Sequence, residues 1–284
     1  MTADDFVRRR LRAFLREDIG PGDLTTDSFA GLDARRARAV FRAREAGVLA
    51  GLHFAGEVFR LLDPSARIDR REVAEGAAMA AGTALAEVEA AAGALLRGER
   101  TALNIVQRLS GIATLTRQYA DALAGTPVRL LDTRKTTPGF RFFEKYAVRV
   151  GGGHNHRLGL FDGVMIKDNH IATVGDIGAA VRAARGHAPV TVRIEVEAET
   201  LAQVDAALAA GADIIMLDNM DPDAMRQAAA RVAGRAKLEA SGRVTLEELP
   251  RVAAAGVDYI STSAVITRAR WLDIGLDFVA EEAR

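Results

Sequence analysis

The chain has 284 residues, and its 38 basic side chains are balanced by 38 acidic ones. A zero net charge argues against general nucleic-acid binding, which draws on a basic surface. The absence of cysteine excludes disulfides and thiolate metal sites and fits a reducing compartment. The N-terminus has no secretory pattern, and no uninterrupted apolar run reaches about 18 residues. We therefore predict a cytoplasmic protein that binds neither nucleic acid nor membrane.

The first third of the chain mixes helical and extended patterns. Apolar residues at helical spacing predict a helix over 4–17 and a long helix over 93–123. A shorter helix is predicted over 52–62, where Asp63 and Pro64 stop it. Residues 37–50 look extended, and residues 67–90 have strand and turn character. This block shows no clear repeat.

From about residue 127, short apolar runs alternate with helical patterns. Runs of this length and aliphatic content are typical of buried parallel strands, and the alternation implies a parallel sheet. "AAGAD" and "AAGVD" each place Gly where a helix C-cap is expected. The predicted strands lie at 128–132, 163–168, 190–197, 213–219, 236–242 and 258–264, and the predicted helices at 141–149, 174–185, 199–210, 221–233 and 245–255.

Polar side chains recur where these predicted strands end. An open doubly wound sheet fits the alternation, but it would concentrate polar groups near one switch point. A (β/α) barrel instead delivers functional groups from several strands to its C-terminal rim. We therefore predict a barrel, which need not have all eight strands. The strand-end residues are Asp132, Arg134, Lys135, Lys167, Glu195, Asp218, Ser241, Thr262 and Ser263.

The predicted rim carries both cations and acids. Arg134 and Lys135 in "TRKTTPG" offer a guanidinium fork and a point charge for carboxylates or phosphates, although a solvated loop pair is the plain alternative. Glu195 and Asp218 end successive strands, so we expect their carboxylates to lie together and to hold Mg²⁺ or sugar hydroxyls, unless they serve only as counter-ions. Glu197 shares a face with Glu195 and is a lesser candidate.

Histidines cluster around "GGGHNHR" (151–157), with His154 and His156 inside it and His170 nearby. A zinc site must compete with the missing cysteines and with the adjacent cations Arg157 and Lys167, which repel Zn²⁺. An anion-facing loop, in which glycines let the backbone approach a ligand, is favoured. His156 and Arg157 are the predicted ligand contacts, and the role of His154 stays open.

Phosphate binding is predicted at the last two strands. Ser241-Gly242 and Thr262-Ser263 each follow a predicted strand and precede a helix or turn. Phosphate sites in barrels of this kind are often built there from backbone N–H groups.

Several motifs together resemble the quinolinate phosphoribosyltransferase family. They are "ERTALNIVQRLSGIATLT" (99–116), "LLDTRKTTPGFRFFEKYAVRVGGGHNHRLGLFDGVMIKDNHI" (130–171), "IEVE" (194–197), "IMLDN" (215–219) and "LEASG" (238–242). The resemblance implies a partly closed α/β barrel, type II phosphoribosyltransferase-like, over residues 113–267. It also implies an N-terminal α/β sandwich domain over residues 1–112, completed by residues 268–284. The expected activity converts quinolinate and phosphoribosyl pyrophosphate into nicotinate mononucleotide, pyrophosphate and CO₂, a step of NAD biosynthesis.

The same resemblance implies roles for individual residues. Lys135, Glu195 and Asp218 are the expected catalytic residues, with Mg²⁺ held by Glu195 and Asp218 partly through water and substrate. A homodimer or an assembly of dimers is expected, with Arg100 supplied across the interface. The expected substrate-binding residues are Arg100, Thr133, Arg134, Lys135, His156, Arg157, Lys167, Glu195, Asp218, Ser241, Gly242, Arg243, Thr262, Ser263 and Ala264.

The sequence departs from the family pattern at two positions and leaves rival functions open. Arg243 and Ser263 stand where relatives often have Gly, which affects the expected geometry of the phosphate site. A Schiff-base lyase using Lys167 or Lys135 leaves the paired acids and dense arginines unexplained. A non-catalytic anion-binding protein and a phosphoribosyltransferase that uses nicotinate without decarboxylation are two further possibilities. A molybdenum-transport-associated relative shares the fold but lacks the full "GGGHNHR" and "KDNH" set.

Overall fold

The structure is a computed structural model that describes residues 3–70, 73–242 and 244–279. The chain divides into two compact units, the first formed by residues 1–114 with 269–284 and the second by residues 115–268. Within the described ranges, no helix combines the length and apolar character that crossing a membrane requires.

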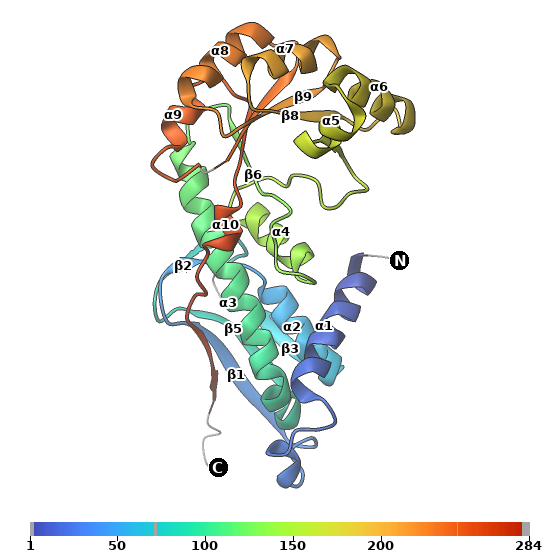
Figure 1. Cartoon of the computed structure of the whole chain (residues 1–284). Coiled ribbons are helices and arrows are strands. Elements are labelled where there is room, and N and C mark those ends of the chain that lie inside the picture. The colour runs from blue at the N-terminus through green and yellow to red at the C-terminus, as the bar shows by residue number, and fades with distance from the viewer. Residues whose placement is uncertain (1–2, 71–72, 243, 280–284) are drawn as a thin grey trace. The chain divides into compact units, whose positions relative to one another are not determined.

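The first unit is built on a four-stranded antiparallel sheet with helices against one face (Figure 1). Its elements are α1 (Ala3–Ile19), η1 (Thr26–Ser28), β1 (Arg36–Ala43), β2 (Gly47–Val48), α2 (Leu52–Leu62), β3 (Arg67–Arg70), β4 (Ala78–Met79), β5 (Ala84–Ala91), α3 (Ala92–Ala122, whose last turns belong to the second unit) and β12 (Ile274–Phe278).

The period-two pattern of β1 determines which face of this sheet is buried. Ala39, Phe41 and Ala43 are fully buried, and the Phe41 ring lies 6.1 Å from the ring of Phe59 on α2. The sheet order is β12-β1-β5-β3, and β2 pairs with β4 in a separate two-stranded sheet. Strand β12 pairs antiparallel with β1, so a segment near the C-terminus completes a sheet that starts near residue 36.

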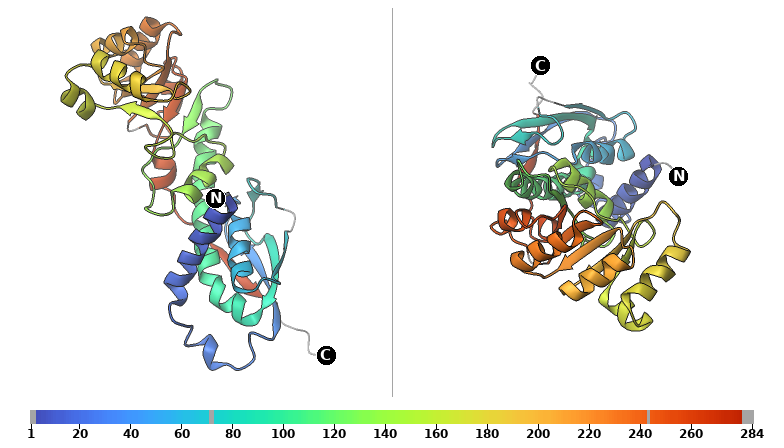
Figure 2. Two further views of the ribbon diagram at one scale, coloured as in Figure 1. Left: turned by 90° about the vertical axis from the view of Figure 1, so that its right-hand side faces the viewer. Right: turned by 90° about the horizontal axis from the view of Figure 1, so that it is seen from above.

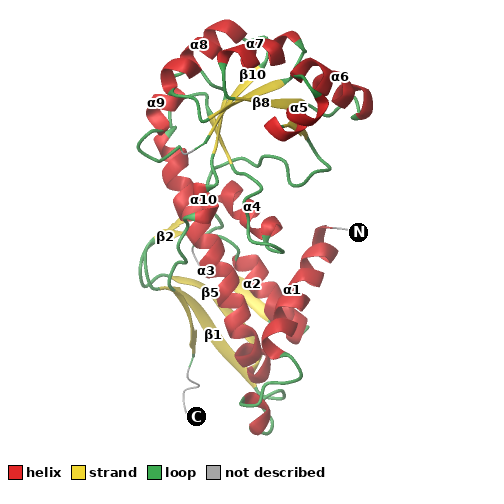
Figure 3. Ribbon diagram, in the orientation of Figure 1, coloured by secondary structure: helices red, strands yellow, loops and turns green. Residues whose placement is uncertain are grey.

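The second unit alternates parallel strands with helices, as the sequence predicts (Figure 3). Its elements are β6 (Arg129–Leu131), α4 (Arg141–Val150), β7 (Val164–Ile166), α5 (Asp168–Val174), α6 (Ile177–His187), β8 (Ile194–Ala198), α7 (Leu201–Ala209), β9 (Ile214–Asp218), α8 (Pro222–Val232), β10 (Lys237–Ser241), α9 (Leu249–Ala253), β11 (Tyr259–Ser261) and α10 (Ala264–Thr267).

The strand order makes this sheet a partly closed barrel. It runs β6-β11-β10-β9-β8-β7 with every pair parallel, so the first strand of this sheet in chain order lies beside its last. In Figure 2 the elements of this unit run from green to red along the chain. No ladder joins β6 to β7 among the described residues, and the barrel is open there. On β6, Leu131 forms an isolated parallel bridge with His154, so the "GGGHNHR" segment lies at this opening. The predicted barrel is confirmed.

One predicted helix begins later than expected, and a short helix that was not predicted precedes it. The expected helix over 174–185 is α6, which begins later, after α5 has ended before Gly175. Gly175 has a φ of 112°, a value that favours glycine, and the Asp176 side chain accepts a hydrogen bond from the backbone N–H of Ala179. This N-cap starts a new helix and leaves α5 as a separate short helix after Lys167.

Candidate active site

A cavity of about 680 Å³ lies at the carboxyl ends of the parallel strands, within the size range of small-molecule sites. Five cationic side chains, five carboxylic acids and His156 belong to its wall. The lining residues are Thr133, Arg134, Lys135, His156, Arg157, Met165, Lys167, Asp168, Ile171, Glu197, Glu199, Gln203, Met216, Asp218, Asn219, Glu239, Ser241, Gly242, Val244, Ser261, Thr262, Ser263, Ala264, Thr267 and Arg268.

Most residues predicted for the site line this cavity. Arg100 instead lies exposed on α3 in the first unit, Glu195 is buried, and Arg243 falls outside the described residues. The predicted residues that line the cavity are Thr133, Arg134, Lys135, His156, Arg157, Lys167, Asp218, Ser241, Gly242, Thr262, Ser263 and Ala264.

The register of the sheet decides which acids reach the cavity. Glu195 on β8 pairs with Ile214, four residues before Asp218 on β9, which is about 13 Å along a strand. Glu197 pairs two residues higher, opposite Met216, and lines the cavity with Asp218. The expectation that Glu195 and Asp218 lie together is therefore corrected. Strand β8 continues to Ala198, so Glu197 holds the rim position that the sequence prediction gave to Glu195.

A buried ion pair holds the "GGGHNHR" loop. Lys145 on α4 donates to Asp132 at the end of β6, and both side chains are almost completely excluded from solvent. Asp132 also accepts hydrogen bonds from the backbone N–H of His156 (2.8 Å) and the side-chain amide of Asn155 (2.7 Å). Lys145 Nζ donates in addition to the carbonyl oxygen of His156 (3.0 Å). The pair thus holds the backbone of His156 from both sides.

Burial and pairing act in opposite directions on these two groups. Burial raises the pKa of Asp132 and lowers that of Lys145, whereas the charge and hydrogen bonds of the partner favour the ionised form of each. An isolated charge at either position would be strongly disfavoured, so the two residues depend on one another.

Helix α4 also holds the loop that carries Arg134 and Lys135. The buried carboxylate of Glu144 accepts hydrogen bonds from the backbone N–H (2.8 Å) and the hydroxyl (3.0 Å) of Thr137. Arg141 Nε donates to the Thr136 hydroxyl (2.9 Å), and its Nη1 donates to the carbonyl oxygen of Leu158 (3.1 Å). One short helix therefore contacts both cation-bearing loops.

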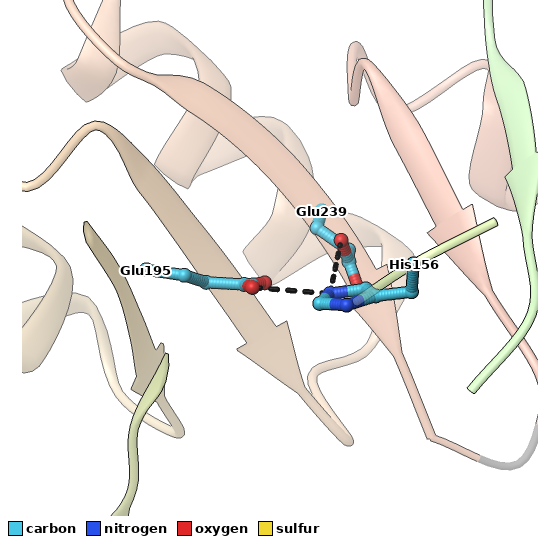
Figure 4. A group of neighbouring side chains, drawn as sticks. All are labelled: His156, Glu195 and Glu239. Carbon is cyan, nitrogen blue, oxygen red and sulfur yellow. Dashed lines mark ion pairs between the residues drawn. The ribbon is translucent and has the colours of Figure 1, made fainter. Parts of the chain in front are cut away.

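Two buried glutamates face the imidazole of His156 (Figure 4). His156 Nε2 lies 3.0 Å from an oxygen of Glu195 on β8 and 3.5 Å from an oxygen of Glu239 on β10. The other oxygen of each glutamate is buried without a hydrogen-bond partner among the described residues. Burial by itself would lower the pKa of His156, but the two glutamates raise it to about 10, and burial raises the pKa of Glu195.

The second ring nitrogen of His156 has a backbone partner. Nδ1 of His156 accepts a hydrogen bond from the backbone N–H of Arg157 at 2.7 Å, so it carries no proton in this geometry. A doubly protonated ring would lose this bond. The two glutamates favour a second proton on the ring, as the raised pKa of His156 indicates, whereas Nδ1 can accept the Arg157 N–H only while it is unprotonated. The geometry described here is therefore that of the ring with one proton, on Nε2 beside the two carboxylates.

The same geometry argues against a metal ion among these three side chains, although their ligand atoms lie within 4.8 Å of one another. A metal at Nε2 would need the lone pair of that nitrogen. With Nδ1 also unprotonated, the ring would have to be an imidazolate. The hydrogen bond at Nδ1 therefore disfavours a metal ion held by His156 with the two glutamates. That His154, His156 and His170 form no zinc site stays a prediction.

Comparison with known proteins identifies the family. The model of the quinolinate phosphoribosyl transferase N-terminal domain matches residues 23–110, and that of the C-terminal domain matches residues 112–277. The chain belongs to this family. A probable carboxylating nicotinate-nucleotide pyrophosphorylase from Synechocystis is 49% identical over 272 residues, which cover 95% of this chain and 91% of that protein.

Two further relatives agree with this family. The decarboxylating quinolinate phosphoribosyltransferase 2a of Nicotiana tabacum is 38% identical over 288 residues, covering 95% of this chain and 81% of that protein. The crystal structure of NadC from Streptococcus pyogenes matches with a TM-score of 0.91 and 41% identity, covering 99% of each chain.

For this member of the family, sequence reasoning missed several residues of the cavity and its support. Glu239 lies inside "LEASG", and its alternation with Ser241 on one face of β10 was a usable signal. Ser261, whose buried hydroxyl lacks a hydrogen-bond partner among the described residues, precedes the predicted Thr262. Lys145 and Glu144 had no sequence signal, because their partners lie in other segments.

The buried ion pair yields a stability prediction. Lys145→Met should lower the free energy of unfolding by about 3–5 kcal/mol, because it leaves the Asp132 carboxylate buried without its cation. Lys237→Met is the matched control, since Lys237 and Asp258 form an ion pair that solvent reaches, and its effect on the free energy of unfolding should be much smaller. Denaturant unfolding of the two variants measures both values. Equal losses would contradict the role given to the buried pair.

Proposed function

We propose that this chain is a quinolinate phosphoribosyltransferase. It transfers phosphoribosyl from phosphoribosyl pyrophosphate to quinolinate with loss of CO₂, giving nicotinate mononucleotide and pyrophosphate for NAD biosynthesis. The carboxylating name of the Synechocystis relative describes the same chemistry written from the nucleotide side.

The guanidinium groups of Arg134 and Arg157 support the proposal that quinolinate is the acceptor substrate. Arg157 is half-buried, and burial together with the charge of Arg134 lowers the pKa of Arg157. The repulsion between two like charges at one cavity wall is offset when an anion with more than one negative charge binds between them. Quinolinate carries two carboxylates on a pyridine ring, which suits Arg134 and Arg157 with Lys167 beside them.

Lys167 is already paired in the free protein. It donates to Glu197, and its backbone N–H donates to Nδ1 of His170 at 2.9 Å. A Schiff-base lyase would need this amine free to attack a carbonyl carbon, whereas here it is held in an ion pair with Glu197. The pairing therefore supports an electrostatic role over a covalent one.

The donor side of the reaction is proposed for the acids and for the ends of β10 and β11. Glu197 and Asp218 offer the hard oxygen ligands that Mg²⁺ prefers, and we propose that they hold it together with the substrate. When bound, Mg²⁺ supplies charge stabilisation for a leaving pyrophosphate. The 5′-phosphate is proposed to lie at Ser241, Gly242 and the hydroxyl cluster of Ser261, Thr262 and Ser263. At Gly242 a Cβ would lie 2.6 Å from the Asn219 side chain, so the turn leaves no room for one.

The proposed mechanism needs positioning and charge rather than covalent catalysis. The ring nitrogen of quinolinate forms a bond to the anomeric carbon as the bond from that carbon to pyrophosphate breaks. Glu197 and Asp218 favour the positive charge that develops on the sugar, and Lys135 favours the departing pyrophosphate. The pyridinium product then accepts the electron pair of the adjacent carbon–carboxylate bond, CO₂ leaves, and the ring carbon takes up a proton.

The direct test measures CO₂ release by the pure protein. With quinolinate, phosphoribosyl pyrophosphate and Mg²⁺ we expect stoichiometric CO₂ and nicotinate mononucleotide. Nicotinate in place of quinolinate should give no nucleotide, because one of its two required carboxylate contacts is missing. Turnover of nicotinate but not of quinolinate would identify a non-decarboxylating enzyme, and binding of quinolinate without any turnover would identify an anion-binding protein.

The corrected register predicts different kinetics for two neighbouring glutamates. Glu197→Gln should lower kcat/KM for phosphoribosyl pyrophosphate by about tenfold or more, because a charge-assisted contact at the rim is lost. Glu195→Gln should leave the KM for phosphoribosyl pyrophosphate within about twofold. This side chain lies below the rim and faces His156, so the donor substrate loses at most one weak hydrogen bond. The reverse ranking in steady-state kinetics would restore Glu195 to the donor site.

We also propose a homodimer in which Arg100 of one protomer completes the site of its partner, in a cytoplasmic enzyme. The exposed position of Arg100 on α3 supports this arrangement. Inactive Arg100→Ala mixed with inactive Arg157→Ala should regain up to about a quarter of wild-type activity, the random-pairing limit when one site of each mixed dimer is intact. No regained activity, with mixed dimers confirmed by mass, would contradict a shared site.

A further inference from the structure

His156 lines the cavity, yet both nitrogens of its ring are already engaged. Nδ1 accepts the backbone N–H of Arg157 at 2.7 Å, and Nε2 faces Glu195 at 3.0 Å and Glu239 at 3.5 Å. Only 14% of the side chain is exposed. In this arrangement the ring has no N–H left to donate to a ligand.

This geometry opposes a direct hydrogen bond from the His156 ring to the substrate, which was the predicted ligand contact. Such a contact would need a proton on a nitrogen that points into the cavity. One nitrogen is turned toward the chain's own backbone, and the other is turned toward two buried acids (Figure 4). Both nitrogens are therefore engaged by the protein itself.

We propose that His156 is a positioning residue for Arg157, which it holds through the backbone N–H, and that Glu195 and Glu239 in turn hold the imidazole. This inference rests on the proposed function in one respect, namely that Arg157 binds a carboxylate of the acceptor. It assigns the two glutamates to the support of the acceptor side of the site and removes Glu195 from the Mg²⁺ ligands.

The surroundings of Arg157 support this role. Its guanidinium Nη1 donates to the carbonyl oxygen of Gly163 at 3.1 Å, so the residue is held at its backbone by His156 and at its tip by Gly163. His170 accepts the backbone N–H of Lys167 through Nδ1 in the same way. Two histidines thus fix the backbones of two cavity cations, and with them the points from which the long side chains reach an anion.

The two possible amide replacements of His156 provide a matched test. The Asn side-chain oxygen occupies the place of Nδ1 and can still accept the N–H of Arg157. The Gln side-chain nitrogen reaches the place of Nε2 and can still donate to the glutamates. If His156 acts through Arg157, His156→Gln should raise the Kd for quinolinate about tenfold, whereas His156→Asn should retain most of the affinity. Equal losses in both variants would overturn the proposal.

A double-variant cycle adds a readout that a purely structural role would not change. In the Arg157→Ala background, His156→Gln should have less than about a twofold further effect on quinolinate affinity, because its route of action is gone. Additive losses would show that His156 contacts the ligand by itself. Thermal unfolding checks that each variant is folded. If His156→Asn is unstable, His156→Asn combined with Glu195→Gln replaces it, since the new amide can donate to Glu239.

The controls separate this inference from the proposed function. The affinity for phosphoribosyl pyrophosphate should stay within about twofold in His156→Gln, since no donor-side contact is removed. If wild-type protein neither binds nor turns over quinolinate, the proposed function fails. If wild-type protein is active and the cycle is additive, only the role of His156 fails.

Discussion

The acceptor side of the cavity depends on the buried ion pair between Asp132 and Lys145. These charges are nearly free of solvent, and each would be costly without the other. Their hydrogen bonds reach the N–H and the carbonyl of His156, so the ion pair fixes a loop that has no regular secondary structure. Within that loop, the imidazole of His156 in turn accepts a hydrogen bond from the backbone N–H of Arg157. The position of Arg157 at the cavity therefore depends on a buried ion pair whose two residues do not line the cavity.

The opening of the barrel separates two arginines of the cavity wall from its strand-borne acids. Arg134 and Arg157 come from the segments beside the opening between β6 and β7, whereas Glu197 and Asp218 come from the continuous strands β8 and β9. A closed barrel would place a strand where the His154 bridge now lies. The missing pairing leaves room for a glycine-rich loop, which can turn its backbone toward neighbours in a way that a strand cannot.

Much of this site follows from the sequence because strand ends can be located from apolar runs. Arg134, Lys167, Asp218 and Ser241 each follow or end such a run, and all of them line the cavity. The choice between Glu195 and Glu197 could not be made in this way, because both lie on one face of β8 and only pairing with β9 sets their height. Sequence spacing indicates which side of a strand a residue occupies, but the register is a property of two strands.

The buried supports were harder to predict for a different reason. Lys145 is thirteen positions away from Asp132, and a lysine in an amphipathic helix normally indicates a solvated face. A histidine cluster is typical of metal ligands, but the adjacent cations already argued against that role in the sequence. In the structure, Nδ1 of His156 and Nδ1 of His170 instead accept backbone N–H groups.

Helix α4 limits how this site can be altered by evolution or engineering. Glu144 and Lys145 are adjacent in the chain, and each holds a different cation-bearing loop, while Arg141 contacts both. A substitution that shifts the helix therefore disturbs both loops at once, and a change in one loop is constrained by the geometry of the other. Residues 132–167 should consequently be inherited and transplanted as one block. Chimeras with crossovers inside this block should fail more often than those with crossovers at its ends.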